Sequence, residues 1–283
     1  MKGHVCAANA EKSVCIVTPV YRFPLPADEE DSLSILRSVL GSFDRFFIIP
    51  KGLSIPDAFR GDERIVEFSE AYFSYPHGYN RLLLRTEFYE TFSGYDFMLI
   101  YQLDCIVFRD ELMEWVDRGW DYVGSPWFID SDKHRHDRPC SVGNGGFSLR
   151  KIATALTLLS QPIKRGILYP KPPVIAPQPS GFSWLFWNLR RRIRQHLGLW
   201  RVTDELENFF ENEDIFWSFV APSLCPGYRK PGVEEALAFG MEEEPRLCVK
   251  ANRDSVPFGC HAWVKHDAPY VRALAAPLIR SGS

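Results

Sequence analysis

The stretch Phe97–Phe108, FMLIYQLDCIVF, constrains the fold most strongly. Ten of its twelve residues are apolar or aromatic, and one carboxylate, Asp104, lies among them. A near-continuous apolar run is typical of a strand that is buried on both faces of a parallel sheet. Asp104 then lies at or near the C-terminal end of that strand, where open α/β sheets bind ligands. A buried carboxylate is costly there unless it is paired or binds a metal, and the alternative is an aspartate that caps the next turn.

Strand and helix patterns alternate through the first half of the chain. This order predicts an α/β fold, with a mixed, mostly parallel sheet that is flanked by helices. We expect strands over residues 13–21, 45–50, 64–69, 97–108, 121–128 and 142–150, and helices over residues 31–43, 78–92, 110–119, 151–160 and 205–224. The pattern indicates a single domain over residues 13–267, with a proline-rich and arginine-rich insertion at about 162–203 and tails at 1–12 and 268–283.

The composition excludes several classes of protein. A formal net charge of −3 provides no global basic field, so we expect no nucleic acid partner. The seven cysteines are scattered, with no pair at two-residue spacing, which argues against a zinc ribbon or a disulfide framework. No signal peptide and no run of eighteen apolar residues is present. We therefore expect a cytoplasmic protein, with contact at the inner face of the membrane left open.

Four short motifs combine residues that carry chemistry: YQLDC, VGNGGFSLRK, ENEDIFW and PFGCHAW. Gly145 and Gly146 leave room for a ligand or another backbone, and Asn144 beside them offers a donor and an acceptor; a bulge or hairpin bend is the alternative. Either Glu213 or Asp214 could point into a cleft, although a carboxylate in a first helical turn also complements the helix dipole.

His261 follows Gly259 between apolar and aromatic neighbours. A lone histidine in such a place is more often a satisfied core residue than a ligand. Together with Asp104, however, it would form a ligand pair suited to manganese or magnesium bound to phosphate oxygens.

In this order, the motifs resemble those of GT-A-fold glycosyltransferases that use nucleotide sugars, and most closely an uncharacterised bacterial family of unknown function. The shared pattern is GYNRLL, YQLD, DYVGSPW, GNGGFSLR, NED and PFGCH, from about Val14 to His266. The resemblance implies a GT-A-like fold and an enzyme that transfers a hexosyl or related sugar from a nucleotide-sugar donor, a UDP-sugar being favoured. It also implies a glycan or lipid-linked acceptor, inversion at the sugar, and a role in bacterial surface polysaccharide or glycoconjugate synthesis.

The resemblance also assigns roles to residues. Asp104 corresponds to the last aspartate of the acidic motif that binds the divalent cation, manganese or magnesium, and His261 corresponds to the histidine that completes its shell. Gln102 stands where that motif usually has its first acidic residue, which keeps a catalytically weak carbohydrate-binding or scaffold protein as the alternative. Asp214 is implied as the catalytic base, with Glu213 as its substitute. The implied donor-binding residues are Thr18, Pro19, Tyr21, Asn80, Arg81, Gln102, Asp104, Asn144, Gly145 and Gly146.

Residues 182–200, FSWLFWNLRRRIRQHLGLW, form an amphipathic pattern. At about 100° per residue, a helix would place Phe182, Phe186, Leu189, Ile193, Leu197 and Trp200 along one line, with Arg191, Arg192 and Arg194 outside it. Such a helix could lie on an anionic membrane or hold a lipid-linked acceptor. The alternative is that the stripe packs on the catalytic domain.

Overall fold

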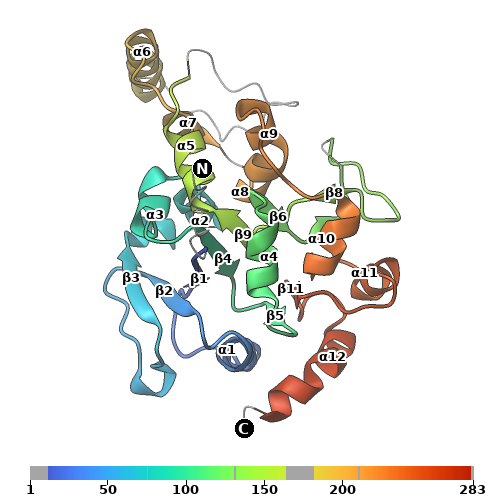
Figure 1. Ribbon diagram of the computed structural model, residues 1–283. Helices are drawn as coiled ribbons and strands as arrows, with labels where there is room; N and C mark the ends of the chain where they lie inside the picture. The colour runs from blue at the N-terminus through green and yellow to red at the C-terminus, as the bar shows by residue number, and fades with distance from the viewer. Residues whose placement is uncertain (1–11, 75, 131, 164–181, 210, 282–283) are drawn as a thin grey trace, which may run out of the picture.

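A six-stranded sheet forms the centre of the protein. The computed structural model describes residues 12–74, 76–130, 132–163, 182–209 and 211–281 (Figure 1). β9 is antiparallel to β4 and β6, whereas β1, β2, β3 and β4 pair in parallel, so the predicted mixed and mostly parallel sheet is confirmed. In sheet order the strands are β3 (Arg64–Phe68), β2 (Asp44–Pro50), β1 (Val14–Pro19), β4 (Phe97–Tyr101), β9 (Phe147–Lys151) and β6 (Tyr122–Gly124).

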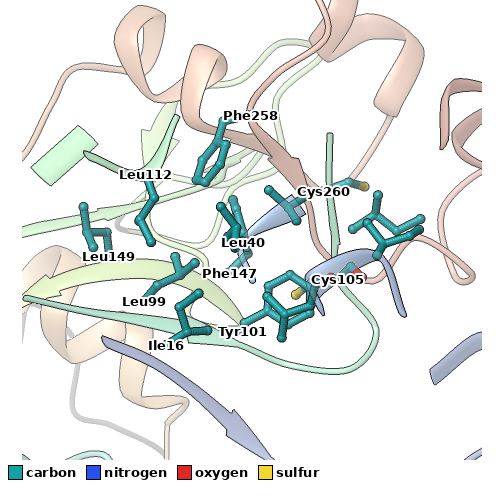
Figure 2. Packing of buried hydrophobic residues seen from close by; sticks show 14 of the residues in the cluster. Ile16, Leu40, Leu99, Tyr101, Cys105, Leu112, Phe147, Leu149, Phe258 and Cys260 are labelled. Carbon is teal, nitrogen blue, oxygen red and sulfur yellow. Dashed lines mark hydrogen bonds between the residues drawn. The ribbon is translucent and has the colours of Figure 1, made fainter. Parts of the chain in front are cut away.

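β4 is buried on both faces, as its apolar sequence predicts. Leu99 and Tyr101 belong to one hydrophobic cluster, and Met98 and Ile100 belong to the cluster on the opposite side of the sheet. Figure 2 shows part of the first cluster, in which Leu99 and Tyr101 lie close to Phe147 of β9. Because successive side chains of a strand point to opposite faces, both layers of helices pack against this one strand.

Helices cover both faces of the sheet (Figure 1). One layer contributes to the cluster that holds Leu99 and consists of α1 (Ala27–Val39), α4 (Leu112–Arg118), α10 (Val233–Phe239), α11 (Pro245–Ala251) and α12 (Ala268–Ser281). The other layer consists of α2 (Pro76–Leu82), α3 (Thr86–Thr91), α5 (Ile152–Ser160), α7 (Val202–Glu205) and η4 (Phe216–Val220). Val271 and Ala275 of α12 are fully buried, so residues 268–281 are a packed helix rather than the tail that the sequence suggests.

The predicted strand over residues 97–108 is two strands. The chain turns after Tyr101, and β5 (Ile106–Val107) then joins β10 (Gly240–Met241) and β11 (Gly259–Cys260) in a second small sheet. The turn is closed by the Cys105 N–H, which donates to the carbonyl of Gln102 over 2.9 Å. Asp104 therefore lies in a turn directly after the central strand, as predicted, and β11 brings a distant part of the chain beside it.

Four other predicted elements are also divided. The helix over residues 78–92 is α2 and α3, because Arg85 is extended and starts a new helix. The helix over residues 205–224 is interrupted at extended Asn212; its pieces after α7 are η3 (Leu206–Asn208), α8 (Glu213–Ile215), the π-helix η4 and α9 (Ala221–Leu224). The strand pair over residues 121–128 and 142–150 also forms a hairpin of β7 (Pro126–Trp127) and β8 (Ser141–Val142). Two short 3₁₀ helices, η1 (Asp57–Phe59) and η2 (Glu70–Tyr72), flank β3.

Candidate functional site

A cavity of about 700 Å³ opens where β1 and β4 end and β9 begins. Its position agrees with the rule that open α/β sheets bind ligands outside the carboxyl ends of their strands. The wall contains residues from eight separate parts of the chain: Tyr21, Phe73, Ser74, Tyr79, Asn80, Gln102, Trp127, Ile129, Asn144, Gly145, Gly146, Asn212, Glu213, Asp214, Ile215, Glu242, Glu243 and His261.

His261 lies at the centre of a polar cluster in this wall. It directly follows β11, and its backbone N–H donates to the carbonyl of Met241 over 2.9 Å. Its Nδ1 lies 3.0 Å from Oε1 of Glu242. On the other side of the ring, Nε2 lies 3.2 Å from Oε1 of Gln102 and 3.4 Å from Oδ1 of Asp104. The structure therefore brings together Gln102, Asp104 and His261, as the sequence predicts.

Asp104, Glu242 and His261 shift one another's pKa values. Burial disfavours a charged imidazole, but the hydrogen bonds and negative charges of Asp104 and Glu242 outweigh burial and raise the pKa of His261 to about 10. Burial alone would raise the pKa of both carboxyls, yet the interaction with His261 holds the pKa of Asp104 and of Glu242 below its ordinary value. These shifts in pKa favour a protonated imidazole between two carboxylates.

Gly145 and Gly146 permit close approach between the strand and the site. A Cβ atom on Gly146 would collide with Nε2 of His261 and lie 2.8 Å from Oε1 of Gln102, and a Cβ atom on Gly145 would collide with Oε1 of Glu213. Glycine is therefore required at both positions by the packing of functional side chains against the backbone.

Asp214 lies in the first turn of α8 and lines the cavity. Its Oδ2 accepts a hydrogen bond from the Gly145 N–H over 3.2 Å, and its Oδ1 accepts one from Ile215 over 2.8 Å. Burial, and after it the negative charges of Glu213 and Glu242, raise the pKa of Asp214 to about 8. A carboxyl with a pKa near the operating pH is suited to general acid and base chemistry.

Glu213 is engaged in a different way. Its two carboxylate oxygens accept hydrogen bonds from Nη1 and Nη2 of Arg150, over 2.9 and 2.7 Å, and both side chains are buried. Arg150 also donates to the hydroxyl of Tyr89 and to the carbonyl of Gly145. Because a buried bidentate pair fixes both partners, Glu213 is placed to hold the loop of Asp214 in position.

The predicted donor-binding residues divide into two groups. Tyr21, Asn80, Gln102 and the Asn144 to Gly146 segment line the cavity. The cavity lining does not include Thr18, Pro19, Arg81 or Asp104; Thr18 is buried within β1, and Asp104 lies beside His261. Asn80 contacts the loop of the acidic motif, since its Nδ2 donates to Oδ1 of Asn212 over 3.2 Å and its Oδ1 accepts from the Glu213 N–H over 3.4 Å.

The residues around His261 fit a hard divalent cation. Oδ1 of Asp104 is buried and lies 3.4 Å from Nε2 of His261, whereas the side chain as a whole is 42% exposed. Carboxylate and amide oxygens suit manganese or magnesium, and the imidazole nitrogen is a borderline ligand beside them. Cys105 also lies within reach of Asp104 and His261, but its thiol is fully buried, donates to the carbonyl of Gly146, and has a pKa that burial raises well above the ordinary value. It is therefore a poor ligand.

A family model described as "Protein of unknown function (DUF5672)" matches residues 62–261, more than half of the chain. The chain belongs to this family. The matched range spans the positions of Asp104, Gly146, Asp214 and His261. No sequence among the curated proteins matches the chain.

Several solved structures of glycosyltransferases are similar to the DUF5672 chain. A glycosyltransferase involved in glycosylation of the major capsid of PBCV-1 is 12% identical, with 93% of this chain and 99% of that chain covered and a TM-score of 0.41. The galactosyltransferase LgtC, in complex with donor and acceptor sugar analogs, is 12% identical, with 93% and 95% covered and a TM-score of 0.41. The glycosyltransferase GlyE of Streptococcus pneumoniae is 11% identical, with 89% and 54% covered and a TM-score of 0.40. At these identities and TM-scores the likenesses carry no argument about the activity of the DUF5672 chain.

Sequence reasoning missed part of the site of the DUF5672 chain. Glu242 contacts His261 but belongs to the run Glu242–Glu244, and such a run is more typical of a solvated surface. Tyr79 and Phe73 form edge-to-face contacts with Tyr21, at 6.0 and 5.6 Å between ring centroids. Tyr79 adjoins Asn80 in the GYNRLL motif, and this was the only signal that could have indicated it.

Proposed function

We propose that the protein is a metal-assisted glycosyltransferase that moves a sugar from a nucleotide-sugar donor to an acceptor hydroxyl. One observation carries the proposal: His261 and Gln102 line the same cavity as the carboxyl of Asp214, which has a raised pKa, and Oδ1 of Asp104 lies 3.4 Å from Nε2 of His261. Sugar transfer needs stabilisation of the leaving diphosphate and a base for the acceptor hydroxyl, and these two groups address the two needs.

The charge of the cavity supports a need for a cation. Its described lining contains Glu213, Asp214, Glu242 and Glu243, but neither lysine nor arginine. A diphosphate in this cavity would meet mostly negative side chains unless a cation lay between them. When bound, manganese or magnesium would supply the positive charge that stabilises the leaving diphosphate.

Asp104, His261 and Gln102 are the residues proposed to hold that cation. With Nδ1 of His261 donating to Glu242, a deprotonated Nε2 would present its lone pair toward Asp104 and Gln102. A carboxylate behind a ligating histidine fixes its tautomer and orientation and raises its basicity. A cation at Nε2 would take the place of the proton that this nitrogen carries in the metal-free protein.

The other lining groups are proposed to bind the donor and acceptor. The aromatic cluster of Tyr21, Phe73 and Tyr79 offers faces and edges for a nucleotide base, and Asn144 offers its side-chain amide to the donor sugar. Thr18, Pro19 and Arg81 do not line the cavity, and their proposed role is to support the residues that do. We expect a UDP-sugar as the donor, a glycan or lipid-linked hydroxyl as the acceptor, and inversion at the transferred carbon, because Asp214 deprotonates the acceptor.

The test is turnover of donor by purified protein. UDP-glucose, UDP-galactose, UDP-N-acetylglucosamine and GDP-mannose are incubated with manganese, and release of the nucleoside diphosphate is followed with and without sugar acceptors. We expect Asp214→Asn to lower kcat by about 10²–10⁴-fold with little change in donor affinity, because a general base acts in the transition state. The matched control is Asp62→Asn, whose side chain is 98% exposed.

Two results would contradict this function. Turnover that Asp214→Asn leaves unchanged would remove the base from the proposal. Tight donor binding by the parent protein without any turnover would instead support a carbohydrate-binding or scaffold protein, the alternative that Gln102 raises.

A further inference from the structure

Helix α6 (Phe182–His196) presents an apolar face to solvent. Leu185, Phe186, Leu189, Ile193 and Leu197 are each between 51% and 64% exposed. Figure 1 shows α6 at the upper edge of the molecule, beyond α7 and away from the central sheet. Among the described residues this face is therefore exposed rather than packed on the rest of the domain, which was the alternative for this stripe.

The arginines of α6 fall into two sets. Nη2 of Arg191 pairs with Glu205 over 2.5 Å, and Nη1 of Arg194 pairs with Asp204 over 3.4 Å, so these two attach the helix to α7. Arg190 and Arg192 are exposed and form no ion pair among the described residues. At about 100° per residue, the five exposed apolar residues span an arc of about 120°, and Arg190 and Arg192 lie about 20° beyond its two edges.

This arrangement differs from the sequence pattern in one respect. Trp200 is 1% exposed, and its Nε1 donates to Oε2 of Glu205 over 2.8 Å. It anchors the end of the segment to the domain and does not belong to the stripe. The side chain of Phe182, also expected in the stripe, lies outside the described residues.

The positive charge around α6 indicates which kind of surface would bind its exposed apolar face. From Lys164 to Arg201 the chain contains eight lysines and arginines and no acidic residue, in a protein whose net charge is −3. An apolar stripe with an arginine at each edge can bury its leucines at the boundary of the acyl chains while the guanidinium groups reach lipid phosphates. A uniformly basic segment is also attracted to an anionic leaflet.

We propose that the exposed face of α6 docks the protein on an anionic membrane surface, with Leu185, Leu189 and Ile193 in the interface. Arg190 and Arg192 contact the lipid headgroups, and Arg191, Arg194 and Trp200 hold the helix to the domain. No described helix is long and apolar enough to cross a bilayer, so the contact is peripheral.

The test is co-sedimentation of the full chain with vesicles of phosphatidylcholine alone or with 30% phosphatidylglycerol, at low and high salt. We expect binding to the anionic vesicles that weakens with salt. We expect Arg190→Glu with Arg192→Glu to weaken vesicle binding about 30-fold or more. Each arginine near the surface contributes about a fivefold increase in affinity, so the loss of two corresponds to about 30-fold. Leu189→Ser with Ile193→Ser should also release the protein.

The matched controls change exposed residues far from α6 in the sequence. Arg60→Glu with Arg253→Glu tests charge, because these side chains are 67% and 87% exposed, and Leu247→Ser with Val264→Ser tests apolar exposure, because both are 45% exposed. Unfolding curves verify that each variant folds.

Absence of vesicle binding by the parent protein overturns the proposal, and so does an equal loss of binding in the control variants. Self-association of the parent that Leu189→Ser and Ile193→Ser abolish, without vesicle binding, would assign the face to a second copy. The assay uses no sugar substrate, so its outcome is independent of the proposed transferase activity.

Discussion

The Arg150–Glu213 pair should be the most sensitive polar contact in the site. Glu213→Gln keeps the shape of the side chain but removes its charge, which leaves a buried guanidinium without its counter-ion. Breaking a buried pair from one side costs about 3–5 kcal/mol. The unfolding entropy of 283 residues is about 0.6 kcal/mol per kelvin, so the expected decrease in Tm is about 5–8 °C.

The same change should alter catalysis in a defined direction. The negative charge of Glu213 is one cause of the raised pKa of Asp214, so its removal lowers that pKa and moves the acid limb of kcat/KM to lower pH. The assays are thermal unfolding followed by circular dichroism and donor turnover between pH 5 and 9. Glu234→Gln is the control, because its pair with Arg253 lies on the surface, with side chains 84% and 87% exposed, and should change Tm by less than about 1 °C.

A double variant separates the pair from its surroundings. Arg150→Met combined with Glu213→Leu should cost less than the sum of the two single changes, because neither charge is then left alone. A Tm for Glu213→Gln within 1 °C of the parent, or an acid limb that moves to higher pH, would refute this account of the pair.

The remaining predictions concern the cavity and the core. Gly146→Ala should abolish manganese-dependent donor binding, since its Cβ would collide with His261; Gly94→Ala, with nothing within 4 Å of its Cβ, should not. The kcat/KM of the parent should rise about tenfold per pH unit up to about pH 8, where Asp214 loses its proton, and a profile flat from pH 6 to 8 would exclude Asp214 as the base. Glu242→Gln should weaken manganese binding about 10–100-fold in a titration, because the Glu242 carboxylate orients His261. Glu243→Gln removes an ion pair with Arg135 and should leave manganese binding unchanged. Val271→Ala should destabilise the fold by about 2 kcal/mol in urea unfolding, whereas Val264→Ala should have little effect, since α12 belongs to the core.

Much of the fold could be predicted from the sequence because local patterns report burial. The apolar run before Asp104 predicts a strand buried on both faces, and β4 is such a strand. Gly119 predicts the end of α4, and it takes the left-handed conformation there, with φ 68°. Patterns that depend on one element and its immediate neighbours are therefore the ones that were read correctly.

Features that depend on distant contacts could not be predicted in this way. The helix over residues 205–224 is broken where extended Asn212 accepts a hydrogen bond from Asn80, which lies in a different helix. Glu242 joins the site only because β10 pairs with β11 and places it beside His261. Arg150 looks like an ordinary strand residue in the sequence, and its role follows from a partner 63 positions away.

The central claim is that the cavity binds a donor diphosphate through a cation held by Asp104 and His261. Isothermal titration of UDP, and in parallel of GDP, into the protein with manganese and with EDTA tests it most directly. We predict binding that requires manganese in the parent, is lost in Asp104→Asn and His261→Ala, and persists in Asp110→Asn, which changes an exposed carboxylate six positions further along the chain. Equal affinity with EDTA and with manganese, unchanged by either substitution, would contradict the claim.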